Sequence, residues 1–250
     1  MISVERPLAI LSALAEEQVG LVEQLHGAQR QTHAGREFWS GTLQGLPVVL
    51  ALSRIGKVAA ATTTAALIAH FQAGAIVFTG VAGGVGRRVQ VGDVVVGTGY
   101  VQHDMDASPL FPRYEIPLTG QSVIQADATL ARALVFAAVV GLQGMQHAGR
   151  PATVHQGLIA SGDRFVNGAD ETHAIVSGLQ SRGYEALAVE MEGAAVAQVC
   201  HDYGVPFAAV RTISDRADDS AHVDFPVFVR EVASVYAQRI VAELLRTLAV

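Results

Sequence analysis

The sequence predicts an α/β fold, a three-layer α/β/α sandwich around a central mixed sheet, in a single domain that covers residues 1–250. Short apolar runs rich in Val and Ile alternate with longer amphipathic stretches along the chain, as in proteins whose helices cover both faces of a sheet. Half of the 250 residues are hydrophobic, which is enough to bury one large core. No segment between the expected elements has the composition of a linker.

Each element follows from its local pattern. Strands are expected where apolar runs end at glycine, proline or polar clusters, and helices where apolar residues recur every three to five positions, as Phe228, Val232, Val235, Ile240 and Leu244 do. In chain order the sequence predicts a strand at 7–14, a helix at about 16–25, a hairpin of strands 37–43 and 46–53 around "QG", a helix at 57–71, strands at 74–80 and 92–102, a helix at 127–142, a strand at 153–161, a helix at about 169–180, a strand at 186–191, a helix at 193–204, a strand at 205–214 and a helix at about 224–248.

The segment 104–125 has three prolines and no regular pattern. We expect it to form a long loop inside the domain, and a long loop in a compact domain often serves as a lid or a contact arm.

Composition excludes several classes of function. The net charge is −6, and no run of Lys or Arg exceeds the pair Arg87–Arg88, so no nucleic-acid surface is indicated. A single cysteine, Cys200, excludes an internal disulfide or a cysteine-built zinc site and is expected to be a buried small hydrophobe. No apolar run reaches the roughly 18–20 residues of a membrane span, and the first residues lack the layout of a signal peptide. We therefore expect a cytoplasmic protein.

Four polar clusters follow predicted strands, at the ends where ligands bind in α/β folds. They are "LAEEQ", "TGVAGG", "VEMEG" and "SDRADD". Three of them carry carboxylates suited to acid–base chemistry, which are Glu16 or Glu17, Glu190 or Glu192, and Asp215 or Asp218. Each carboxylate could instead stabilise a helix N-terminus or a turn. Their repetition at matching strand ends favours a functional site.

Two further motifs are weaker signals. The glycine-rich "TGVAGGVG" lacks the Gly-Lys-Ser/Thr ending of a phosphate loop and the dinucleotide spacing, although its glycines would let the backbone approach a ligand. The stretch "QHDMD", residues 102–106, has residue types that a metal could use, but a hydrogen-bonded corner is the expected structure. No metal and no cofactor is predicted.

The motifs together resemble a known family. The blocks "AILSALAEE", "SRIGKVAAATTT", "FTGVAGGV", "VQHDMD", "GLIASGDRFVN", "AVEMEGAAVAQVC" and "VPFAAVRTISDRAD" cover nearly the whole chain. They resemble those of the bacterial 5′-methylthioadenosine/S-adenosylhomocysteine nucleosidases of the nucleoside phosphorylase superfamily. The resemblance implies a nucleoside phosphorylase-like fold and hydrolysis of the N-glycosidic bond between adenine and a 5′-thio-substituted ribose.

The resemblance also implies roles for individual residues. Glu17, helped by Arg211, would position and activate the attacking water, while Asp215, oriented by Ser214, would protonate adenine N7. Such an acid needs a raised pKa at neutral pH, which burial can supply. The substrate-binding residues would be Glu192 on the ribose hydroxyls, Met191 against the ribose and base, Phe165 stacked on adenine, Val166 with backbone hydrogen bonds to the base, Ile55 on the ribose side, and Val81, Ala82 and Gly83 at the glycine-rich strand end. Val81 stands where some relatives carry a serine that can touch the water.

Partners follow from the same resemblance. We expect a nucleoside as the small-molecule partner, no nucleic acid or membrane, and a homodimer in which the arm 105–117 completes the neighbour's 5′ pocket. Candidates for this contact are Met105, Leu110, Ile116 and Pro117.

Other functions stay open at this stage. A purine nucleoside phosphorylase would need a cationic phosphate cradle, and "VFTGVAGG" has no arginine. An aminodeoxyfutalosine nucleosidase would share the same catalytic residues. An AMP nucleosidase would need a basic patch for the 5′-phosphate, and the sequence shows none on that side. A non-catalytic nucleoside-binding protein could lack Glu17 or Asp215, and both acids are present.

Overall fold

The computed structural model describes residues 6–217 and 225–249. Asp218 and Asp224, which the sequence analysis considered, lie outside these ranges. In chain order the elements are β1 (Leu8–Ser12), a 3₁₀ turn (Ala15–Gln18), β2 (His26–His33), β3 (Arg36–Leu43), β4 (Leu46–Leu52), α1 (Lys57–Ala69), β5 (Ala75–Gly84), β6 (Val94–Gln102), β7 (Val123–Gln125), α2 (Ala128–Gly141), β8 (Gln146–His147), β9 (Arg150–Pro151), β10 (Val154–Ser161), α3 (Ala169–Gln180), β11 (Ala186–Glu190), α4 (Gly193–Tyr203), β12 (Phe207–Asp215), α5 (Phe225–Phe228), a π-helical segment (Val229–Ala233) and α6 (Ser234–Leu248).

A mixed sheet forms the middle layer, as predicted. Its strand order is β11-β10-β6-β12-β5-β1-β4-β3-β2, with β7 added beside β6. Strands β1, β5 and β12 run parallel, whereas β12 is antiparallel to β6. A further antiparallel pairing places Ala188 of β11 beside Gly84 of β5 and Val189 beside Gly83. This pairing closes five strands into a ring, β5-β12-β6-β10-β11.

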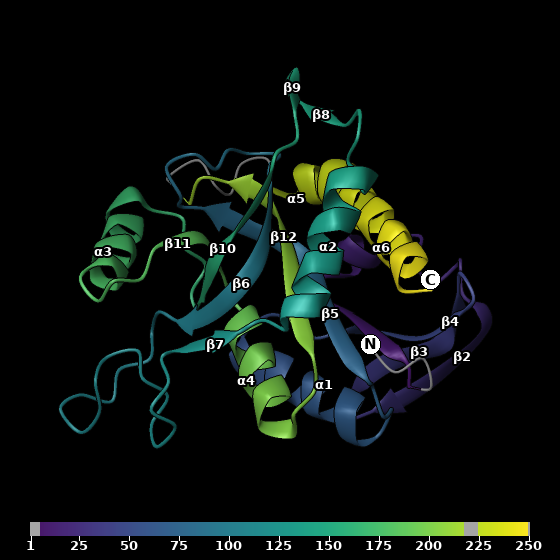
Figure 1. Ribbon diagram of the computed structural model, residues 1–250, viewed down its shortest axis with the longest axis horizontal. Helices are drawn as coiled ribbons and strands as arrows, with labels where there is room; N and C mark the ends of the chain where they lie inside the picture. The colour runs from purple at the N-terminus through teal and green to yellow at the C-terminus, as the bar shows by residue number, and fades with distance from the viewer. Residues whose placement is uncertain (1–5, 218–224, 250) are drawn as a thin grey trace.

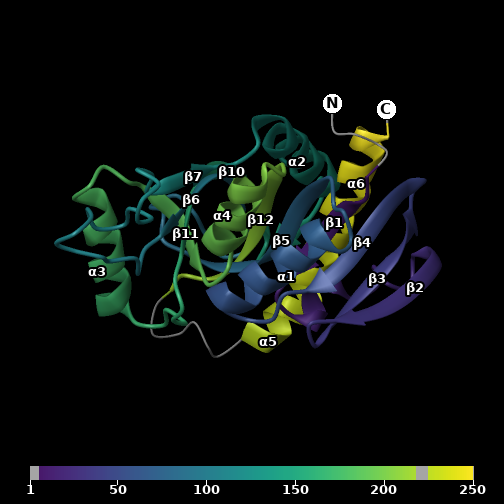
Figure 2. The ribbon, with the colours of Figure 1, turned by 90° about the horizontal axis from the view of Figure 1, so that it is seen from below.

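Helices cover both faces of the sheet, which confirms the predicted three-layer sandwich. Figures 1 and 2 show α2 beside α6 on one face and α1 beside α4 on the other. Helix α3 lies outside these layers, beyond β11 at the edge of the molecule.

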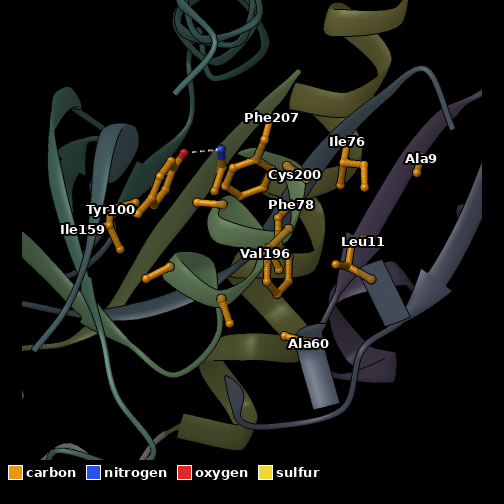
Figure 3. Packing of buried hydrophobic residues seen from close by; sticks show 14 of the residues in the cluster. Ala9, Leu11, Ala60, Ile76, Phe78, Tyr100, Ile159, Val196, Cys200 and Phe207 are labelled. Atoms are coloured by element: carbon orange, nitrogen blue, oxygen red, sulfur yellow. Dashed lines mark hydrogen bonds between the residues drawn. The ribbon is translucent and has the colours of Figure 1, made fainter. Parts of the chain in front are cut away.

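Two buried clusters fill the spaces between the layers. Strand β1 is buried along its whole length, with Leu11 in the cluster under α1 and α4 and Ile10 in the cluster under α2 and α6. Figure 3 shows the first cluster, in which Cys200 packs near Phe207 and Tyr100 accepts a hydrogen bond from the Ala209 amide. Cys200 is thus the buried small hydrophobe that the sequence predicts.

Most predicted elements are confirmed. The short strands β7, β8 and β9 were not predicted, and three larger differences concern the helix at 16–25, strand β2 and the last helix. The predicted helix at 16–25 is wrong, because only Ala15–Gln18 are helical and Gly20 has φ +79°. Strand β2 was not predicted, since all eight of its residues are exposed and it shows no apolar alternation. The last helix is interrupted by the π-helical segment Val229–Ala233.

Segment 104–125 is irregular up to β7, as predicted, and projects beside β7 as an arm (Figure 1). Its residue Ile116 pairs with Gln121 and packs into the chain's own core with 6% of its surface exposed. Ile116 is therefore not available for contact with a neighbour, whereas Leu110 is 84% exposed.

Within the described residues, no helix combines the length and the hydrophobicity needed to cross a bilayer.

Candidate active site

The ends of four strands meet at one pocket. Strands β1, β5 and β12 run parallel, so their carboxyl ends lie at the same edge, and the antiparallel pairing of β11 with β5 brings the end of β11 there as well. The pocket encloses a cavity of about 140 Å³ and opens to solvent. Its lining includes Glu17, Ile55, Val81, Ala82, Gly83, Phe165, Val166, Met191, Glu192, Ser214 and Asp215.

Arg211 is the one residue assigned to the site that does not line the pocket. It lies behind the lining, only 1% exposed, and its Nε and Nη2 donate to Glu190 at 3.3 and 2.8 Å. Its Nη1 donates to the Phe78 carbonyl, and the guanidinium lies 4.0 Å from the centre of the Phe78 ring. The expectation that Arg211 helps to position the water has no direct contact to support it.

Glu17 is buried at the end of the turn that follows β1 and is 3% exposed. Its Oε2 accepts hydrogen bonds from the amides of Ala13 and Leu14, and its Oε1 accepts one from Val81 of β5 at 3.1 Å. Burial raises the pKa of Glu17, while these amides and the charge of Arg211 act in the opposite direction. A buried carboxylate with raised proton affinity is suited to act as a base near neutral pH.

Asp215 ends β12 and is held by its neighbours in the chain. Its Oδ2 accepts a hydrogen bond from the Ser214 hydroxyl and its Oδ1 one from the Ala217 amide, both at 2.7 Å. A Cβ at Gly83 would lie 2.9 Å from this Oδ1, and one at Gly80 would lie 3.0 Å from Glu17 Oε1. The glycines of "TGVAGG" thus leave room for the two acids, a role that the sequence analysis did not anticipate.

Glu190 and Glu192 have different environments, although they flank one methionine. Glu190 accepts from both the Arg211 guanidinium and the Gly193 amide at 2.8 Å and from the Ser161 hydroxyl, so it holds the start of α4 on β12 and β10. The sequence analysis did not predict this buried ion pair.

Glu192 lines the pocket and is 6% exposed. Its Oε1 accepts a hydrogen bond from the Gly56 amide at 2.7 Å, just before α1. Burial, together with the negative charge of Glu190, raises the pKa of Glu192 to about 8. A positive charge placed beside a carboxylate with such a raised pKa strongly favours its anionic form.

Apolar side chains form the rest of the pocket. Phe165 and Ile55 are 45% and 55% exposed at its mouth, whereas Val166 is 7% exposed within it. Phe225 of α5 lies against Phe165 with ring centres 5.9 Å apart and also lines the pocket. Phe225 was missed because nothing in the sequence ties the start of the last helix to this site.

No group of three or more His, Cys, Asp or Glu residues suited to a metal ion occurs in the described ranges 6–217 and 225–249. The predicted hydrogen-bonded corner at "QHDMD" is present, since Lys57 Nζ contacts both Gln102 and Asp104 there.

Comparison with known protein families shows to which family the chain belongs. A family model described as the phosphorylase superfamily matches residues 7–246. The chain belongs to this superfamily. The nucleoside phosphorylase-like fold and the resemblance inferred from the sequence motifs are thereby confirmed.

Individual relatives and solved structures are similar to this chain over nearly its whole length. Two 5′-methylthioadenosine/S-adenosylhomocysteine nucleosidases, from Chromohalobacter salexigens and Bacillus subtilis, are 39% and 35% identical over 96% of this chain and 97% and 98% of their own. The Neisseria meningitidis nucleosidase in complex with methylthio-immucillin-A is similar with a TM-score of 0.87 and 36% identity, over 96% of this chain and 99% of its own. Futalosine hydrolase from Helicobacter pylori has a TM-score of 0.84 and 31% identity, over 96% of this chain and 98% of its own.

Proposed function

We propose that the protein hydrolyses the N-glycosidic bond of 5′-methylthioadenosine and S-adenosylhomocysteine, releasing adenine and the thioribose. The observation that carries this proposal is the meeting of three buried carboxylates, Glu17, Glu192 and Asp215, in one largely apolar pocket. Each is fixed by at least one backbone amide. The names of the relatives support the same activity and the same two substrates.

Asp215 is the proposed general acid. Adenine is a poor leaving group until N7 is protonated, so the proton passes from Asp215 to N7 as the bond between the anomeric carbon and N9 breaks. The electron pair of that bond stays on the base. The Ser214 hydroxyl donates to Oδ2 at 2.7 Å and the Ala217 amide to Oδ1 at 2.7 Å, which orients the carboxyl group.

Glu17 is the proposed base. It takes a proton from the water whose oxygen forms the new bond to the anomeric carbon. The three amide donors of Ala13, Leu14 and Val81 fix the direction of its oxygens, so the water can be aimed without reorganisation of the side chain.

Glu192 is the proposed group that binds the 2′- and 3′-hydroxyls of the ribose. Burial and the charge of Glu190 raise its pKa to about 8. Hydrogen bonds from the hydroxyls and the positive charge that develops on the ribose both favour its anionic form. This interaction is therefore stronger in the transition state than in the bound substrate, which is the condition for catalysis.

Phosphorolysis is less well supported. Within the described residues, Arg164 is the only cation that lines the pocket, and its side chain is 74% exposed and paired with Glu171 at 3.1 Å. The Glu17 carboxylate also opposes an anion beside the glycine-rich strand end. Hydrolysis of aminodeoxyfutalosine is the second candidate, because a futalosine hydrolase is among the similar structures.

Further features of the proposal concern assembly and location. We propose a cytoplasmic homodimer in which the arm 105–117 reaches the neighbour's 5′ pocket, with a role in methionine salvage. The exposed Leu110 on the arm and the half-buried Met105 and Pro117 remain its candidate contacts. Sedimentation at several protein concentrations would test the dimer.

The decisive assay is adenine release from methylthioadenosine, S-adenosylhomocysteine and aminodeoxyfutalosine, each with and without phosphate. We expect release from the two thio-nucleosides that does not depend on phosphate, with free thioribose as the second product. Dependence on phosphate with a ribose 1-phosphate product would indicate a phosphorylase, and release from aminodeoxyfutalosine alone would indicate the second candidate. No release from any of them would favour a binding protein.

A further inference from the structure

A polar cluster outside the pocket joins three segments of the chain. Asp104 Oδ1 accepts a hydrogen bond from Lys57 Nζ at 2.6 Å, and Asp104 Oδ2 accepts one from the Asp163 amide at 2.9 Å. Asp163 Oδ1 in turn accepts a hydrogen bond from the Lys57 amide at 2.7 Å. The three residues therefore form a closed ring of contacts, which we call the clasp.

The clasp lies next in sequence to two walls of the pocket. Lys57 follows Ile55, which lines the pocket, and Gly56, whose amide donates to Glu192. Asp163 precedes the pocket residues Arg164, Phe165 and Val166. We propose that Lys57, Asp104 and Asp163 are positioning residues that hold the ribose-side wall and the base-side wall at the separation needed for the nucleoside. This role rests on the proposed function.

The start of α1 links the clasp to Glu192. Helix α1 has no side-chain cap of its own, and Gly56 before it has φ +97°. The first amides of the helix are instead satisfied by carboxylates from elsewhere, Asp163 on Lys57 and Glu192 on Gly56. If Asp163 moved away, the Lys57 amide would lose its acceptor. The start of α1 would then be held less firmly, and so would the Gly56 amide that donates to Glu192.

Opposite charge and partial burial strengthen the contact between Lys57 and Asp104. The side chains of Lys57 and Asp104 are 16% and 31% exposed, and Lys57 Nζ also donates to Gln102 at 3.0 Å. Burial tends to raise the pKa of Asp104, but the Lys57 ammonium and the Asp163 amide hold it below its ordinary value. Gln102 continues the connection by donating to Gln198 of α4 at 2.8 Å.

The kinetic test compares Asp104→Asn with the wild type and with a matched control. Loss of charge-assisted contacts to Lys57 should raise KM and the dissociation constant of adenine about tenfold, while kcat changes less than about threefold. Glu243→Gln is the control, because it removes a carboxylate paired with Arg246 on α6, which contributes no residue to the pocket. Lys57→Met should have a similar effect. The effect of the double variant should be smaller than the sum of the two single effects, because both substitutions break the same ion pair between Lys57 and Asp104.

Amide hydrogen exchange provides a readout that needs no substrate. In Asp104→Asn, peptides covering residues 54–58 and 161–166 should both exchange faster than in the control. Kinetics and exchange equal to those of Glu243→Gln, faster exchange in only one of the two peptides, or a loss of kcat at unchanged KM would each overturn the clasp. Failure of the wild type to release adenine would instead contradict the proposed function, while the exchange result would still decide the clasp.

Discussion

The raised proton affinity of Glu192 should make the protein less stable as the pH rises. Burial and the charge of Glu190 raise its pKa from the ordinary 4.5 to about 8. Between these two values the folded protein keeps a proton that the unfolded chain has already released. Raising the pH through this range therefore favours unfolding, and the penalty is complete above about pH 8.

The substitution Glu192→Gln should remove this penalty. Each tenfold difference in proton affinity corresponds to about 1.4 kcal/mol, so the change from 4.5 to about 8 sets an upper limit of about 5 kcal/mol. Glutamine keeps an acceptor for the Gly56 amide, now at 2.7 Å, and has no proton to lose. We expect the variant to match the wild type at pH 5 and to exceed it by about 2–5 kcal/mol at pH 8.5, or about 5–15 °C in Tm.

Urea unfolding followed by circular dichroism from pH 5 to 9 measures this difference. Glu17, whose pKa burial also raises, is present in both proteins and adds a pH dependence of the same sign to both curves. Glu243→Gln should follow the wild type across the range. Parallel stability curves for Glu192→Gln and the wild type would refute the reasoning, because the variant would then differ by a constant amount.

Three further substitutions test the site. Asp215→Asn should lower kcat by a factor of about 10²–10⁴ while adenine still binds, as measured by adenine release and calorimetry; rates like those of the wild type would contradict its role as the acid. Gly83→Ala should lower turnover and cost about 1–3 kcal/mol in urea unfolding, since the new Cβ would lie 2.9 Å from Asp215 Oδ1; an unchanged rate would show that the acid can move freely. Arg211→Lys should cost about 3–5 kcal/mol in the same unfolding assay, because lysine cannot satisfy Glu190 and the Phe78 carbonyl together; full stability would argue against the buried pair.

Much of the fold could be predicted because its elements are locally marked. Strand β1 and helix α1 have the apolar pattern and flanking breaks expected of their type. The predicted helix at 16–25 is wrong because the Glu17 side chain turns back to accept from the amides of Ala13 and Leu14, and Gly20 adopts positive φ. The apolar spacing on which the prediction relied does not report either feature. Strand β2 has no apolar face, so only its pairing with β3 reveals it.

The site also has features that could be predicted from the sequence and features that could not. Carboxylates at strand ends could be found from sequence order, since the ends of parallel strands share one edge of a sheet. The Glu190–Arg211 pair could not, because it depends on the antiparallel approach of β11 to β5 beside β12. The clasp joins residues 57, 104 and 163, whose proximity likewise follows from tertiary structure and not from spacing.

The place of β12 in the sheet has a consequence for synthesis of the protein on the ribosome. Strands β5 and β6 follow each other in the chain but lie on either side of β12, one of the last strands to be made. A nascent chain that has not yet reached Asp215 therefore lacks the central strand of its sheet as well as the proposed acid. We expect such a chain to cleave no nucleoside, so activity during translation would appear only after β12 has been made, and products truncated before Asp215 would not contribute to it.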